Sequence, residues 1–80
     1  MEQQRIQSFI DTQKDQAIEM YKKGEMGIDK TIGQLSSLAN LATEIVDIPR
    51  MQKVGELMLQ LRQESMDDPN TYKQEAALAN

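Results

Sequence analysis

Few residues of this chain are able to do chemistry, and most of them are cationic. The 80 residues contain no His and no Cys. The chain therefore lacks an imidazole general base, a thiolate nucleophile and the ligands of the usual zinc and iron–sulfur sites. The neighbouring acids Asp67 and Asp68 could be offered as an acid–base pair or a magnesium site, but no convergent set of partners supports that interpretation. We therefore expect a binding protein, not an enzyme, with no catalytic residue, metal or cofactor.

Basic residues open the second of two predicted helices, at the end where acidic residues are usual. Arg50 and Lys53 lie in its first turn, and acids gather near its end. Each exposed charge that opposes the helix macrodipole costs about 0.3–1 kcal/mol. An anion bound by Arg50 and free backbone N–H groups would offset this cost, which points to a phosphate-sized ligand. The alternative is that Arg50 pairs with Asp47 or Glu44 and that Lys53 is solvated.

Lys22 and Lys23 form the only adjacent basic pair in the sequence, and Gly24 follows them. A lysine there can reach a phosphate, while the glycine lets a ligand or a second backbone come close. Two other interpretations stay open. The lysines complement the negative end of a helix that stops there, or they lie on a solvated face where Glu19 pairs with Lys23.

Phe9 and Tyr21 lie on the apolar stripe of the chain, and Tyr72 follows it. A ring on that stripe either packs in a core or stacks on a nucleobase. The methionines suit a core or a groove that accepts a partner helix. The candidate ligand-binding residues are Phe9, Tyr21, Lys22, Lys23, Gly24, Arg50 and Lys53.

The overall charge limits the choice of partner. Nine Lys and Arg against thirteen Asp and Glu give a net charge of −4. An acidic chain repels a phosphate backbone, so a nucleic-acid polymer is an unsuitable partner. The absence of cysteine fits a reducing compartment. With no apolar run of about 20 residues and no charged-then-apolar leader, we expect a cytoplasmic protein that does not bind a membrane.

Apolar residues recur at helical spacing along most of the chain. From Ile6 to Ile45 they recur in steps of three and four residues, apart from a polar gap at Gln13 and Lys14, and the phase runs through Gly24 and Gly27. A glycine there would ordinarily end a helix. Because the phase is unbroken, the pattern favours one long helix with a kink near Gly24–Gly27 over two separate helices.

The clear break lies at Val46–Pro49. Asp47 can accept hydrogen bonds from the first turn of a new helix, and proline is tolerated in that turn. The new helix carries its apolar stripe to about Met66, and the short connection makes the two helices an antiparallel hairpin. No strand signal is present. The prediction is an all-α chain with a hairpin domain over residues 1–66. A turn and polar tail over residues 67–80 either form a short helix or fray.

Glycine content and size both favour association. Gly33 and Gly55 lie inside predicted helices, where each costs about 1 kcal/mol relative to alanine. They indicate close helix packing, within the hairpin or between copies, or else a ligand lying against bare backbone. A core of this size rarely supplies more than about 3–5 kcal/mol. With no disulfide or metal, we expect the fold to be completed by homo-oligomerisation.

Two segments resemble a known family. Pro49-Arg50-Met51-x-x-Val54-Gly55-x-x-x-Leu59-Gln60 is similar to the Pro-Arg-Trp-x-x-Ile-Gly-x-x-x-Leu-Gln opening of the last helix in phage-encoded anti-CBASS sponges. Tyr21-Lys22-Lys23-Gly24-Glu25 resembles the Ile-Lys-x-x-Gly-Glu helix that precedes it, and related anti-Thoeris sponges share the hairpin. The likeness spans roughly residues 20 to 60, and Met51 replaces the tryptophan of the family.

The resemblance implies an all-helical homo-oligomer, typically a hexamer, that binds cyclic di- and trinucleotide messengers without cleaving them. The phosphate-contacting lysine of the family would fall at Lys22 or Lys23, and Phe9 is nearest to its base-stacking tyrosine. The basic residue that opens the last helix matches Arg50. The leading hypothesis is therefore a phage-type immune-evasion protein of the host cytosol that sequesters cyclic nucleotides. The alternative is a small helical module, an inhibitor or adaptor, that docks on a protein through its Met- and Leu-rich hairpin.

Overall fold

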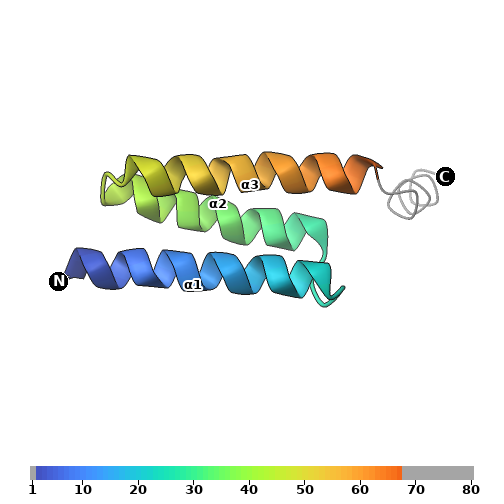
Figure 1. The fold of residues 1–80 in the computed structure, drawn as a ribbon, viewed down its shortest axis with the longest axis horizontal. Coiled ribbons are helices and arrows are strands. Elements are labelled where there is room, and N and C mark those ends of the chain that lie inside the picture. Colours follow the sequence, from blue (N-terminus) through green and yellow to red (C-terminus); the bar gives the residue numbers. More distant parts are fainter. Residues whose placement is uncertain (1, 68–80) are drawn as a thin grey trace.

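The computed structural model describes residues 2–67, which form three α-helices joined by short turns. Helix α1 is Glu2–Lys22, α2 is Ile28–Glu44 and α3 is Ile48–Asp67. They lie side by side and run in alternating directions (Figure 1), so the predicted all-α fold is confirmed over these residues, and α2 with α3 is consistent with the predicted antiparallel hairpin. Residues 2–67 include no strand. The tail predicted beyond the hairpin falls, except for the first of its residues, on positions 68–80, outside the described residues.

The first predicted helix is two helices, so the prediction of one continuous helix through Gly24–Gly27 is wrong. Gly24 has a φ of +76°, a left-handed conformation that glycine adopts without steric cost. The N–H of Gly24 donates to the carbonyl of Tyr21 at 3.0 Å, and that of Glu25 donates to the carbonyl of Met20 at 2.9 Å. This Schellman pattern satisfies the last carbonyls of α1. The apolar phase continues because α2 folds back and buries its own stripe against α1.

The turn between α2 and α3 repeats this pattern with a less suitable residue. Val46 has a φ of +55°. Its N–H donates to the carbonyl of Thr43 at 3.0 Å, and the N–H of Asp47 donates to that of Ala42 at 2.8 Å. A side chain in this conformation costs about 1–2 kcal/mol, because Cβ crowds the following carbonyl oxygen. The valine is 74% exposed, so little packing offsets the strain.

Replacing this valine relieves the strain. Val46→Gly should stabilise the fold by about 1 kcal/mol, because glycine has no Cβ to crowd the carbonyl. The expected rise in melting temperature, followed by circular dichroism, is roughly 4–8 °C. Val46→Ala keeps a Cβ and is the matched control, for which we expect the smaller gain. If Val46→Gly melts below the parent, the turn is not strained at this residue.

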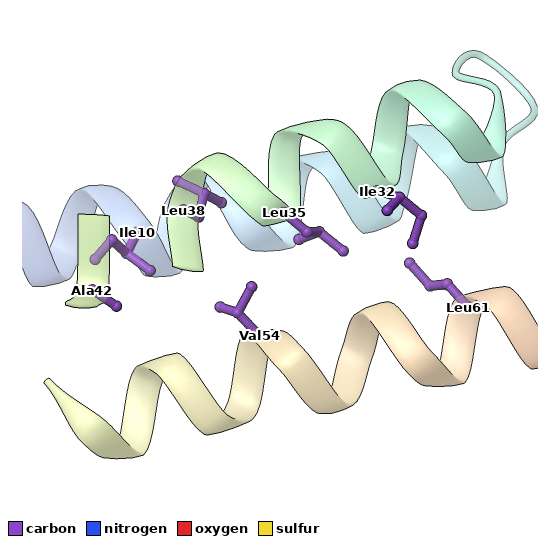
Figure 2. Packing of buried hydrophobic residues seen from close by; sticks show 7 residues of the cluster. All are labelled: Ile10, Ile32, Leu35, Leu38, Ala42, Val54 and Leu61. Carbon is purple, nitrogen blue, oxygen red and sulfur yellow. The ribbon is translucent and has the colours of Figure 1, made fainter. Parts of the chain in front are cut away.

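One apolar core joins the three helices, and α2 is its central element. Helix α2 packs against both α1 and α3. Figure 2 shows the two α3 residues of this core facing the side chains that α2 supplies. The core residues confirm the predicted apolar stripe of each helix. They are Ile10, Ile32, Leu35, Leu38, Ala42, Val54 and Leu61.

Gly33 and Gly55 lie inside α2 and α3, as predicted. A Cβ added to either glycine would meet no atom of the described chain within 4 Å beyond its own helix turn. The expectation that these glycines allow close helix packing within the chain is therefore wrong. Their role in contacts between copies or with a ligand stays a prediction.

Candidate ligand-binding site

A groove between α1 and α2 presents an aromatic ring to solvent. The side chain of Phe9 is 52% exposed and lines a groove of about 200 Å³ together with Gln13, Gln34, Ser37 and Leu38. Helix α1 places Gln13 one turn after Phe9, and buried Leu38 of α2 supplies an apolar wall. The amides and the hydroxyl can each donate and accept hydrogen bonds. A ring face beside such groups offers two contacts to an unstacked nucleobase: stacking on the ring and hydrogen bonds to the edge of the base.

The predicted basic pair lies at the other end of α1. Lys22 and Lys23 line an open hollow of about 450 Å³ with Asp15, Ile18 and Glu19. The ammonium of Lys23 lies 3.0 Å from a carboxylate oxygen of Glu19, so one interpretation left open by the sequence, pairing of these two residues, is confirmed. Lys22 is exposed and makes no ion pair within residues 2–67. Of the two lysines, Lys22 is the one that a ligand can reach without breaking an ion pair.

A hydrogen-bonded network at the start of α3 reaches across to α1. Asp47 caps α3, because its Oδ1 accepts the backbone N–H of Arg50 at 3.2 Å, as its position before Pro49 predicts. The Arg50 guanidinium donates to Asp47 Oδ2 at 2.9 Å and to the two carboxylate oxygens of Asp11 at 3.1 and 2.9 Å. The amide of Gln7 also donates to Asp47 Oδ2, at 2.9 Å. These residues, Gln7, Asp11, Asp47 and Arg50, are called the Arg50 network below.

Opposing effects set the pKa of Asp47, whose side chain is nearly inaccessible to solvent. Burial raises the pKa of this carboxyl, but hydrogen bonds from the backbone and side chain of Arg50 and from Gln7 outweigh it and hold the pKa below its ordinary value of 3.8. Hydrogen bonds to Asp11 and Asp47 raise the pKa of Arg50. Asp47 and Arg50 are therefore both charged at neutral pH.

Arg50 is occupied by the protein itself at the place where the sequence suggested a bound anion. The alternative interpretation, in which Arg50 pairs with Asp47, is confirmed. Asp11 is a second partner, at 2.9 Å. A phosphate at Arg50 would have to displace an aspartate, so we assign Arg50 a positioning role between α1 and α3. Lys53 is exposed and has no ion pair within residues 2–67.

A single chain does not bring the predicted site residues together. The positions of Phe9 and Lys22 on α1 correspond to about 20 Å along the helix axis. Arg50 and Lys53 lie near the start of α3, at the end of the bundle opposite to Lys22 (Figure 1). Tyr21 is half-buried and packs against the core. The ring and the cations thus occupy three separate places on one chain.

The sequence did not predict several residues of the Phe9 groove and of the Arg50 network. Gln13 follows Phe9 by one helical turn, so helical spacing alone could have placed it at the groove. Gln34 and Ser37 come from α2 and reach the groove only because the chain reverses at Gly24. Asp11 lies 39 residues from Arg50, and no local pattern connects the two.

Comparisons with known proteins find no significant match for this chain among family models, curated proteins or solved structures. Over residues 2–67, no helix combines the length and the apolar character needed to cross a membrane. In the same part of the chain, no three acidic side chains gather where they could hold a metal ion. The geometry of the grooves and charges is therefore the basis for interpreting function.

Proposed function

We propose that this chain binds cyclic di- or trinucleotides without cleaving them and sequesters them between copies of itself. The observation that carries the proposal is the half-exposed ring of Phe9 in a groove that also holds Gln13 and Gln34. A nucleobase stacks on such a ring and pairs its edge with the amides. A two-fold-symmetric cyclic dinucleotide suits two identical grooves related by a two-fold axis.

The phosphates of the ligand would be met by cations from different copies. Lys22 and Lys53 are exposed, and neither makes an ion pair within residues 2–67. A net charge of −4 disfavours a long nucleic acid but leaves room for a compact dianion at a few local cations. The resemblance to anti-CBASS sponges agrees with this ligand class and suggests a phage-encoded inhibitor of a cyclic-nucleotide immune signal, acting in the host cytosol as a homo-oligomer.

Isothermal titration calorimetry with a panel of cyclic di- and trinucleotides tests the proposal. At micromolar protein, we expect at least one member of the panel to bind without being consumed. Phe9→Leu keeps an apolar side chain but removes the ring. It should weaken binding about tenfold, because stacking on an aromatic side chain contributes about 1–3 kcal/mol per base. Lys22→Ala should also weaken binding, and increasingly so at low salt.

Leu59→Ala is the matched control, since Leu59 is an exposed apolar residue of α3 away from the groove. It should bind nucleotide as the parent does. Absence of heat from every member of the panel would reject nucleotide binding. Equal affinities for the parent and Phe9→Leu would reject the Phe9 groove as the base site.

A second candidate function, docking on another protein, is favoured by one face of α3. Ile48, Leu59 and Met66 are 46%, 66% and 69% exposed, and their spacing places them on the same side of the helix as Gly55. Such an apolar stripe with a glycine at its middle suits a partner helix. This function predicts that no nucleotide raises the melting temperature of the chain, whereas a ligand selective for the folded state must raise it.

A further inference from the structure

The outward face of α1 has an uncharged middle and a charge pair at each end. Phe9, Thr12, Gln13, Gln16 and Met20 follow one another at steps of three and four residues, so they lie on one side of the helix. Phe9 is 52% and Met20 37% exposed, and the hydroxyl and amide side chains between them are uncharged. This face lies beside the core side of α1, and its flank of Phe9 and Gln13 lines the groove with buried Leu38 of α2.

The charges at the two ends of this face alternate in sign. Glu2 and Arg5 lie on it near the start of α1, and Glu19 and Lys23 lie at its end. All four side chains are exposed. Glu19 and Lys23 pair with each other at 3.0 Å, whereas Glu2 and Arg5 make no ion pair within residues 2–67. Arg5 and Glu19 are separated by about 21 Å along α1, so they cannot meet within one chain.

A second copy laid antiparallel on this face would meet complementary charges. We consider the register in which a residue of one copy lies level with the residue of the other copy whose number brings their sum to about 25. Arg5 then lies beside Glu19 of the second copy, and Glu2 lies beside its Lys23. The two-fold axis repeats both contacts. A parallel copy would instead place each charge against itself, which is unfavourable. The charge order therefore selects one orientation.

We propose that the middle of this face, Thr12 and Gln16 with Arg5 and Glu19 beside them, pairs antiparallel with the same face of a second copy, while Phe9 and Gln13 stay on the flank toward α2 and open to a ligand. The pairing deepens the proposed function. The pairing itself is argued from the charges of α1, and only its contribution to ligand binding rests on the proposed function. In this register Lys23 of the second copy lies about 10 Å along the helix from Phe9, against about 21 Å within one chain. The copy thus brings a second cation toward the base groove, in addition to Arg5, which lies about 6 Å along α1 from Phe9 in the same chain.

A charge-exchange experiment on the full chain, without nucleotide, tests the pairing. Sedimentation equilibrium measures the dimer dissociation constant of the parent, of Arg5→Glu and of Glu19→Arg. Each single variant places like charges together twice in the dimer, so its dissociation constant should rise about tenfold or more. The double variant exchanges the two charges and should restore association.

Mixing the two single variants gives the sharpest result. A mixed dimer holds one copy of each variant. At one end the glutamate at position 5 of the first variant faces the arginine at position 19 of the second, and at the other end Arg5 of the second variant faces Glu19 of the first. An equimolar mixture should therefore associate more tightly than either variant alone. Lys30→Glu and Glu56→Arg make the same changes in net charge at exposed positions of α2 and α3 and should associate as the parent does.

Circular dichroism establishes that all variants keep the helix content of the parent. The pairing is overturned if the parent is monomeric at about 100 µM, if the single variants associate as the parent does, or if the mixture stays as weak as its components. Since no nucleotide is present, these outcomes leave ligand binding by the Phe9 groove as a separate question. A failure of nucleotide binding would likewise leave the charge exchange intact.

Discussion

Leu35→Ala should remove most of the stability of the fold. Leu35 is fully buried, at 0% exposure, in the core that α2 shares with the other two helices. Truncating a buried leucine costs about 2–5 kcal/mol, from the lost apolar contacts and the cavity that remains. A core of this size rarely supplies more than about 3–5 kcal/mol. The melting temperature should therefore fall by roughly 10–20 °C or more, or the cooperative transition should disappear.

The same substitution on the surface provides the control. Leu59→Ala removes the same atoms from a side chain that is 66% exposed on α3, so it should change the free energy of unfolding by less than about 0.5 kcal/mol. Both variants are compared by urea unfolding at low micromolar concentration. Equal losses at the two positions would mean that the centre of the core does not lie at Leu35.

Acid should loosen the contact between α1 and α3 through Asp47. The pKa of Asp47 in the folded chain lies below its ordinary value of 3.8, so the unfolded chain binds a proton more readily. Stability is then fully present above the unfolded pKa and is lost as the pH falls through the folded pKa. We expect the melting temperature to fall as the pH is lowered from about 5 to 2.5.

Variants at Asp47 separate charge from capping. Asp47→Asn keeps a side-chain oxygen for the cap but loses the charge that pairs with Arg50, so it should melt lower at pH 7 and lose part of the acid dependence. Asp47→Ala also loses the cap and should melt lowest, roughly 4–8 °C or more below the parent. Asp15→Asn removes an exposed carboxylate outside the Arg50 network and should change the melting temperature at pH 7 little. An Asp47→Asn variant that matches the parent at every pH would rule out this role.

The parts of the fold that the sequence predicts are those with a local cause. The three-and-four spacing identifies Ile10, Leu35 and Val54 as buried, and the Asp47–Pro49 segment identifies the start of α3. The turn at Gly24 escapes this reasoning because a glycine is tolerated inside a helix and also favoured at its end. The backbone hydrogen bonds of Gly24 and Glu25 decide between these states, and the apolar phase is the same in both.

The candidate site shows the same limit. Exposure of Phe9 and the freedom of Lys22 depend on which neighbours the chain reversal brings, and spacing alone leaves open whether Phe9 packs or stacks. Arg50 is a stronger example, because its partner Asp47 is local but Asp11 is 39 residues away. Long-range charge pairs of this kind need the tertiary structure, since the sequence pattern offers Arg50 only its local partners Asp47 and Glu44.

The order of the helices has a consequence for the kinetics of assembly. Because α2 packs against both of its chain neighbours, most contacts between helices join segments that are separated by one short turn. Loop-closure entropy is then small at every step, and topologies of this kind fold within microseconds to milliseconds. A site between copies would accordingly appear at the rate at which copies meet, so its availability would depend on the concentration of the protein and not on the folding of each chain.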